Sequence, residues 1–426
     1  MAVFAGMLAF TSCSNDDNLV TTGNETSEEL KAGEGILEIG ISNTGIGSRD
    51  ARPVGSSAAA NNVNKVKLVA YKQENENWEK DNSVKWKDGD TEKELVLDWS
   101  AGPSGEGAST TERLGKQSIK LTHLTANSSY KFVAYGYNGE TDPYASTDAT
   151  ASKFVTQTKL SGYAIEELFA GETATIETDD NSKFTTTSNS VTLTREVAGI
   201  LAYFQNVPSH INGEKVETIK VCANKKSTGF TFPSAADNFF NGKPTESTED
   251  VLITFTMATI ATNYNDAGVT GTYTFADLSE TGTTEAATAS QTCPVADGYT
   301  APVGLKLAQN SIFGGRYIMP YDKHYDEQTL TVKMYGTNAT TPLRTLKVKT
   351  NQKMDSPATE YTYDIRRNNF YSIGQKLYTG NTGGNPDPEN PDKPDPDKPV
   401  DLNKNTDITV IINDAWNVLH NMDVED

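Results

Sequence analysis

The sequence predicts an all-β protein made of two β-sandwiches. Short segments of alternating apolar and polar residues recur along its 426 residues, with turn-forming residues between them. No long stretch repeats its apolar residues every 3.6 positions, as an amphipathic helix would. The chain is long enough for two domains and an extended tail.

The expected strands fall into two groups. In the first group we expect strands at 36–42, 63–71, 93–99, 117–124 and 130–137, with a short helical turn within 162–171. A polar stretch at 179–189 precedes a long β segment at 191–204, so we place a domain boundary near residue 188. In the second group we expect strands at 216–222, 251–258, 271–275, 315–320, 330–335, 344–348 and 369–377. The predicted sandwiches are residues 50–188 and 189–380.

The N-terminus has the features of an export signal. Residues 1–12 are apolar and rich in small side chains, but they are fewer than the ~20 residues that span a bilayer as a helix. The run ends in Leu-Ala-Phe-Thr-Ser-Cys, which resembles a bacterial lipobox with Cys13 as the lipidated residue. We expect a lipoprotein signal peptide at 1–13 and attachment to a membrane through this lipid. The alternative is an incidental cysteine in an N-terminal helix.

Residues 14–49 combine a polar tether with the first strand. Leu37, Ile39 and Ile41 are two positions apart and therefore share one face of that strand. A loop rich in glycine, serine and alanine follows, and it contains Arg49 and Arg52. Such loops are exposed and prone to cleavage, so a cut at either arginine would separate the first strand from the rest of the chain.

A proline-rich spacer occupies residues 381–400. Its central 15 residues are too rich in proline to pack or pair, and at ~3.1 Å per residue they would extend roughly 45 Å. The spacer therefore predicts a stiff arm that holds the last segment of the chain away from the body.

The last segment, residues 401–426, repeats the pattern of the first strand. Ile408, Val410 and Ile412 lie on one face, and Trp416 follows them. A strand on a long arm is suited to donation into a neighbouring molecule, where Trp416 would anchor its far end. Two alternatives stay open: the strand folds back onto its own domain, and Trp416 is a surface aromatic packed on the tail.

Charge and cysteine content narrow the possible partners. The net charge of -20 argues against nucleic-acid binding, because a phosphate backbone needs a basic face. It suits an exposed, soluble surface. Besides Cys13 the chain contains Cys222 and Cys293, which either form one disulfide after export or remain two separate buried thiols.

The sequence contains no recognisable catalytic or metal-binding motif. None of the four histidines has a partner at metal-ligand spacing, and the nucleophile-elbow, P-loop and dinucleotide fingerprints are absent. The many carboxylates leave a glycosidase pair open. Trp78, Trp86 and Trp99 form either a carbohydrate platform or part of the sandwich packing. We expect a protein that is not an enzyme and that uses no metal and no cofactor.

Four features together resemble the fimbrillins, the type V pilus subunits of Gram-negative anaerobes. They are the lipobox at Cys13 with a strand and an arginine-containing loop after it, the Leu-Thr-Arg-Glu-Val-Ala motif at 193–198, the Arg-Asn-Asn-Phe-Tyr-Ser-Ile motif at 367–373, and the Pro-Asp-Pro-Glu-Asn-Pro spacer before a strand with Trp416. In the family, segments similar to the second and third features open and close the second domain. The resemblance spans most of the chain.

The resemblance implies two transthyretin-like β-sandwiches, a Pro-rich spacer and a C-terminal donor strand. It also implies a route: export as an outer-membrane lipoprotein precursor, removal of the lipidated N-terminal piece by an Arg-specific protease, and polymerisation by donor-strand exchange. The partners would be other copies of the chain or related pilins. The product would be an extracellular fimbrium on the cell surface that supports adhesion, with a possible host or bacterial surface ligand.

The processing site implied by the resemblance falls at Arg49 or Arg52. Arg52 precedes Pro53, whose ring and missing N–H hinder most proteases, so we expect a cut at the Arg49–Asp50 bond. Asp50 is not an ideal residue after the cut, and Arg52 stays the alternative.

The removable strand and the donor tail together fit a shaft subunit best. The removable face is Leu37, Ile39 and Ile41, and the donor residues are Ile408, Val410, Ile412 and Trp416. The alternative function is a monomeric surface lipoprotein that binds a glycan or a host protein. The sequence does not name the ligand.

Overall fold

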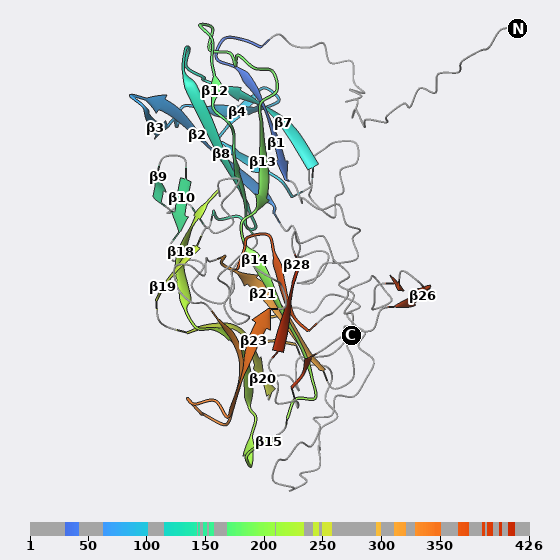
Figure 1. The fold of residues 1–426 in the computed structure, drawn as a ribbon. Helices are drawn as coiled ribbons and strands as arrows, with labels where there is room; N and C mark the ends of the chain where they lie inside the picture. The colour runs from blue at the N-terminus through green and yellow to red at the C-terminus, as the bar shows by residue number, and fades with distance from the viewer. Residues whose placement is uncertain are drawn as a thin grey trace, which may run out of the picture.

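The computed structural model forms two large β-sheets and three small ones, and every regular element of its described part is a strand (Figure 1). The all-β prediction is therefore confirmed. The structure describes residues 30–41, 63–100, 115–142, 144, 148–150, 153–156, 168–208, 210–233, 242–246, 249–257, 295–299, 311–320, 329–350, 365–374, 386–387, 390–394, 400–402 and 408–413.

The first large sheet contains 11 strands in the order β3-β2-β8-β11-β13-β1-β7-β4-β5, with β12 beside β8 and β6 beside β2. Its strands are β1 (Gly35–Ile41), β2 (Lys65–Glu74), β3 (Asn77–Lys80), β4 (Lys85–Asp88), β5 (Thr91–Lys93), β6 (Val96–Asp98), β7 (Gly115–Thr122), β8 (Ser129–Tyr137), β11 (Phe169–Glu172), β12 (Ile176–Glu177) and β13 (Ser190–Arg195).

One hydrophobic core lies inside this sheet. Leu37 of β1 and Leu121 of β7 belong to the same buried cluster as Leu68 of β2 and Phe132 of β8. Because these strands lie far apart in the strand order, the sheet folds over so that its two halves face each other across the core. The alternation of the sequence produces this arrangement, since every second side chain of a strand points inward.

The second large sheet contains nine strands in the order β20-β17-β22-β23-β28-β24-β14-β21, with β27 beside β14. Its strands are β14 (Ala198–Gln205), β17 (Thr218–Ala223), β20 (Asp250–Thr256), β21 (Ser311–Ile318), β22 (Leu330–Tyr335), β23 (Arg344–Thr350), β24 (Phe370–Ile373), β27 (Val400–Asp401) and β28 (Ile408–Asn413). Ile200, Ile219, Val332 and Ile408 share its own buried core.

The small sheets complete the described structure. One joins strands from both halves of the chain in the order β19-β18-β10-β9. The other two are the hairpins β15-β16 and β25-β26. Their strands are β9 (Asp148–Thr150), β10 (Lys153–Thr156), β15 (His210–Ile211), β16 (Glu214–Lys215), β18 (Lys226–Phe232), β19 (Gly242–Glu246), β25 (Pro386–Asp387) and β26 (Asn390–Pro394).

A third buried cluster connects the two large sheets. Tyr71 and Tyr135, from the outer face of the first sheet, pack with Phe232 of β18 and Met319, which follows β21. The rings of Tyr135 and Phe232 meet edge to face with centroids 5.9 Å apart. Aromatic pairs in this geometry contribute beyond their buried area, so the cluster fixes the two sheets against each other.

The β segment expected at 191–204 is two strands in different sheets. β13 pairs with β1 and β11 in the first sheet, whereas β14 pairs with β21 and β24 in the second. The chain passes between the sheets at Glu196 and Val197, so the boundary drawn near 188 precedes the passage by one strand. Apolar alternation continues through the passage, and for this reason the sequence shows no break there.

Of the stretch 162–171, where a short helical turn is expected, residues 162–167 lie outside the described residues, and the described end forms β11 from Phe169 onward. Gly171 of this strand does not mark a turn. A Cβ atom at this position would come 2.1 Å from the carbonyl oxygen of Thr192, so glycine allows β11 and β13 to approach closely.

The proline-rich spacer also departs from expectation, because part of it does pair. β25 and β26 form an antiparallel hairpin with Pro386 opposite Pro394 and Asp387 opposite Asn390. Asp387 and Asn390 keep the backbone N–H groups that proline lacks, and this gives the segment the donors for a short pairing. The strand expected at 271–275 lies outside the described residues.

The tryptophans and Cys222 support the packing alternatives. Trp99 is fully buried and Trp86 is 8% exposed, both in the first core, while half-buried Trp78 carries the ammonium of Lys131 over its ring at 5.2 Å. Cys222 is a free, buried thiol, and burial raises its pKa to about 12. Cys293 lies outside the described residues.

Two buried tyrosines of the cluster between the sheets allow a matched test of the packing. The Tyr71 hydroxyl is buried and has no hydrogen-bond partner within the described structure, whereas the Tyr135 hydroxyl donates to Asp142 at 2.8 Å. Tyr71→Phe should therefore raise the free energy of unfolding by about 1 kcal/mol, and Tyr135→Phe should lower it by about 1.5–3 kcal/mol. Urea denaturation measures both, and a loss for both variants would contradict this account.

The same pair predicts how stability depends on alkaline pH. Burial raises the pKa of Tyr71 to about 12, and burial together with the Asp142 carboxylate raises that of Tyr135 further. The folded chain holds these protons more tightly than the unfolded chain, where the phenol pKa is about 10. Stability should thus be full below about pH 10 and fall as pH rises above it. In denaturation at alkaline pH, Tyr71→Phe should show a shallower fall than the unsubstituted chain.

Candidate strand-exchange site

The first candidate site is the position of β1, which we call the first-strand slot. β1 runs parallel to β13, from Glu38 opposite Ser190 to Ile41 opposite Leu193, and antiparallel to β7 along its whole length. It therefore has ladder partners on both sides and is no edge strand. Figure 1 shows β1 and β13 side by side in the first sheet.

The three aliphatic side chains predicted to share a face all point into the first core. Leu37 and Ile39 are fully buried, and Ile41 is 4% exposed. At ~1.5–3 kcal/mol for each buried aliphatic side chain, they contribute roughly 5–9 kcal/mol to filling the slot. Removing β1 would expose this apolar surface and the edges of two neighbouring strands at once.

The start of β1 is fixed by a turn and an ion pair. Gly33 has a φ of +82°, which glycine adopts readily, and it directs the chain into the strand. The Glu34 carboxylate accepts hydrogen bonds from the Lys31 amide at 2.9 Å and from the Lys87 ammonium at 3.0 Å. Burial alone would raise the pKa of Glu34, but these two donors bring it below its ordinary value.

The second candidate site is the position of β28, which we call the tail slot. β28 runs parallel to β23, with Val348 opposite Ile408, and antiparallel to β24, with Phe370 opposite Asn413. The Ile408 side chain is 3% exposed and lies in the second core. In this structure the C-terminal strand therefore folds back into its own chain, which was one of the two alternatives left open.

The two slots share one pairing geometry. Each strand comes from near one end of the chain and lies parallel to one neighbour and antiparallel to the other. For Val410 and Ile412 the structure gives the backbone pairing, to Ile373 and Tyr371. Cys13, Arg49, Arg52 and Trp416 lie outside the described residues, so lipidation, cleavage and the anchoring role remain predictions.

The structure also shows a contact that the sequence could not predict. The motifs at 193–198 and 367–373, far apart in the chain, meet where β13 passes into β14. The guanidinium of Arg195 donates to the Asn368 side chain at 3.0 Å, and that of Arg367 donates to the Thr194 hydroxyl at 2.9 Å. Arg367 also lies 3.8 Å from the fully buried carboxylate of Glu196. We call this contact the junction.

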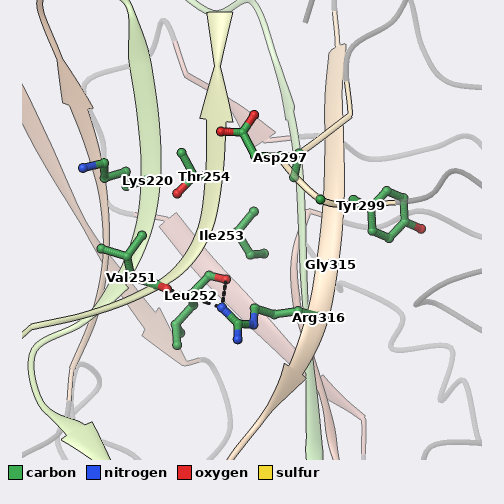
Figure 2. Close-up of a pocket in the computed structure, with 11 residues that line it drawn as sticks. Lys220, Val251, Leu252, Ile253, Thr254, Asp297, Tyr299, Gly315 and Arg316 are labelled. Atoms are coloured by element: carbon green, nitrogen blue, oxygen red, sulfur yellow. Dashed lines mark hydrogen bonds between the residues drawn. The ribbon is translucent and has the colours of Figure 1, made fainter. Parts of the chain in front are cut away.

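A hollow between β20 and β21 is the third candidate (Figure 2). Arg316 of β21 reaches across it and donates to the Leu252 carbonyl at 3.0 Å. On the same edge of β20, the Asp297 amide donates to the Thr254 carbonyl at 2.8 Å, and the Asp297 carboxylate accepts from the Thr256 hydroxyl at 2.6 Å. These polar groups close the seam between two edge strands.

The described lining of the hollow does not contain the pair of carboxylates that glycoside hydrolases use. Asp297 is the one acidic residue in this described lining. Lys220 lies with its ammonium 4.8 Å from the centre of the Tyr335 ring. Within the part of the chain that the structure describes, no three His, Cys, Asp or Glu side chains are grouped to hold a metal ion. No described helix is long and apolar enough to cross a membrane.

Neither a family model nor a curated protein matches this chain. Its structural neighbours are fimbrial and adhesion proteins. A protein provisionally assigned to cell adhesion from Parabacteroides distasonis shares 12% identity with a TM-score of 0.42, covering 92% of this chain and all of its own. The fimbrial anchor protein Mfa2 from Porphyromonas gingivalis shares 9% identity with a TM-score of 0.31, covering 70% of this chain and 77% of its own.

A fimbrial assembly protein from Parabacteroides distasonis shares 10% identity with a TM-score of 0.28, covering 81% of this chain and 91% of its own. Because every identity and TM-score is low, these neighbours carry no argument about what this chain is, binds or assembles with.

The two faces of β1 should differ strongly in their effect on stability. Ile39→Ala removes a fully buried side chain and should lower the free energy of unfolding by about 2–5 kcal/mol. Glu38→Ala, the neighbouring position, loses an ion pair with the largely exposed Lys116 and should cost less than about 1 kcal/mol. Urea denaturation of both variants measures the difference, and equal costs would show that β1 does not fill the slot in solution.

Proposed function

We propose that the chain is a structural pilin of a cell-surface fimbrium that supports adhesion. In this proposal it is exported as an outer-membrane lipoprotein precursor carrying lipid on Cys13, cleaved after Arg49 or Arg52, and polymerised by donor-strand exchange. The observation that carries the proposal is the common geometry of the two slots, each filled by a strand from near one end of the chain.

Cleavage changes how tightly β1 is held. Before the cut, the chain between β1 and β2 keeps the strand at a high effective concentration near its slot. Hydrolysis of the Arg49–Asp50 bond makes residues 1–49 a separate peptide, which is then held only by non-covalent contacts: its ladder, its three buried side chains and ion pairs such as Glu34 with Lys87. Once this peptide leaves, the slot needs a replacement of the same form.

The C-terminal strand has the form of that replacement. Ile408, Val410 and Ile412 repeat the spacing of Leu37, Ile39 and Ile41, so one face of the tail matches the apolar face of the slot. Filling the slot of another copy requires β28 to leave its place between β23 and β24. In the exchange β28 gives up its ladder with β23 and β24 and forms a similar ladder with β13 and β7 of another copy, as in a domain swap.

The second candidate function is a monomeric surface lipoprotein that binds a glycan or a host protein. One observation favours it: both slots are filled by strands of the same chain, and this arrangement requires no partner. The two functions differ in the outcome of cleavage. A pilin should lose its first strand and self-associate, whereas a monomeric binder should gain nothing from a cut.

Limited digestion of the purified chain with an Arg-specific protease tests the proposal. A new N-terminus at Asp50, or at Pro53 when Arg49→Ala blocks the first bond, should be followed by a ladder of multimers in native mass spectrometry. A chain truncated before Asp401 should be cleaved in the same way but should form no ladder of multimers in response to cleavage. Because the truncation also empties the tail slot, any association of this variant should be the same before and after the cut.

A matched pair of tail variants tests the donor face. Val410→Asp places a carboxylate on the apolar face and should abolish the multimers, because burying an unpaired charge is costly. Thr409→Asp lies on the other face by alternation and should retain them. Resistance to cleavage, or a cleaved chain that stays monomeric with its tail present, would favour the monomeric surface lipoprotein.

A further inference from the structure

We propose that the junction couples the two slots, so that loss of β1 loosens β28. The inference rests on the proposed function, because strand exchange needs the tail to stay seated before cleavage and to leave afterwards. It assigns Thr194, Arg195, Glu196, Arg367 and Asn368 as positioning residues: they hold the neighbour of one exchanged strand against the neighbour of the other.

The connection begins at the last residue pair of the first-strand slot. Ile41 of β1 lies opposite Leu193 of β13. The next residue, Thr194, accepts the hydrogen bond from Arg367, and the one after it, Arg195, donates to Asn368. The end of β1 is therefore separated from the junction by one residue of β13. Without β1, this end of β13 loses its ladder partner on one side.

The connection continues from the junction into the tail slot. Residues 366–369 form a turn just before β24, closed by the Asn369 amide donating to the Arg366 carbonyl. The Asn368 amide donates to the Val197 carbonyl at 2.8 Å, which ties this turn to the passage between the sheets. Two residues later Phe370 begins β24, and it lies opposite Asn413 of β28. The turn that the junction holds is thus the start of the strand on which the tail rests.

Buried charge makes the junction a stiff link. The Arg195 side chain is 1% exposed and stacks over the Phe169 ring at 4.9 Å, while Glu196 is fully buried and the Arg367 side chain is 12% exposed. A buried ion that loses a partner is destabilised strongly. The turn therefore does not shift gradually away from Arg195 and Glu196. It either keeps these partners or breaks with them, and this is the behaviour that transmits a change from one site to another.

The coupling would restrain the tail in the uncleaved precursor. A tail that leaves its slot exposes the edges of β23 and β24, which invite pairing with any other strand. Holding β28 until β1 is lost would restrict this exposure to molecules whose own first-strand slot is ready to be filled.

Hydrogen–deuterium exchange on the uncleaved full chain tests the coupling, with Leu37→Ala weakening β1. Leu68→Ala is the matched control, because Leu68 is buried in the same core but lies on β2, away from the ladder with β13. Leu37→Ala should raise exchange in peptides covering β28 by roughly 2- to 30-fold over Leu68→Ala. Peptides covering β17 and β22 should exchange equally fast in Leu37→Ala and Leu68→Ala, since both strands lie away from the junction.

Two junction variants decide whether the signal passes through these residues. Thr194→Val is nearly isosteric and removes the acceptor for Arg367, and the double variant Glu196→Gln with Arg367→Met removes both charges together. In either background the extra exchange caused by Leu37→Ala should disappear from β28. If the double variant does not fold, Thr194→Val alone decides the question.

Two results would overturn the coupling: equal exchange in β28 for Leu37→Ala and Leu68→Ala, or an effect of Leu37→Ala that persists in the junction variants. The measurement needs neither cleavage nor polymerisation. Resistance to the protease would therefore count against the proposed function and leave the coupling untouched. Conversely, a chain that is cleaved and polymerises but shows equal exchange in β28 for both variants would support the proposed function and overturn the coupling.

Discussion

The closure of the first core by β1 is the constraint on which the rest of the structure depends. The strand fills a position with ladder partners on both sides, and three of its side chains complete the apolar interior. Because the sheet folds over its own core, removing β1 would expose apolar side chains and unpaired backbone groups at the same time. The first core is thus completed by a strand that precedes β2 by more than twenty residues of the sequence.

The tail slot in the second sheet is likewise filled by a strand from near one end of the chain. β28 is parallel to one neighbour and antiparallel to the other, as β1 is. Among the described residues the buried charged side chains are Glu34, Arg195 and Glu196, and the last two lie at the junction between the two slots. Other polar groups, such as Arg316 and Asp297, close the seam between β20 and β21. These described polar contacts hold strands of the large sheets against one another.

The aromatic cluster and the small sheet β19-β18-β10-β9 add a second connection between the large sheets. Strands from before and after the passage at Glu196 pair within one small sheet, and Phe232 at the end of β18 packs on Tyr135 of the first sheet. The two large sheets are therefore held together at the junction and at this cluster. Contacts of this kind restrict relative motion of the sheets.

The sequence by itself determined the all-β class, the β22 strand at 330–335 and the inward face of β1, because these depend on local alternation of side chains. Only the tertiary structure decided which strands are neighbours. The segment at 191–204 alternates without a break, yet β13 and β14 belong to different sheets, since a period of two is the same in both. Likewise the pattern of Ile408, Val410 and Ile412 fits any apolar slot. Its seat between β23 and β24 follows from long-range pairing that no local pattern encodes.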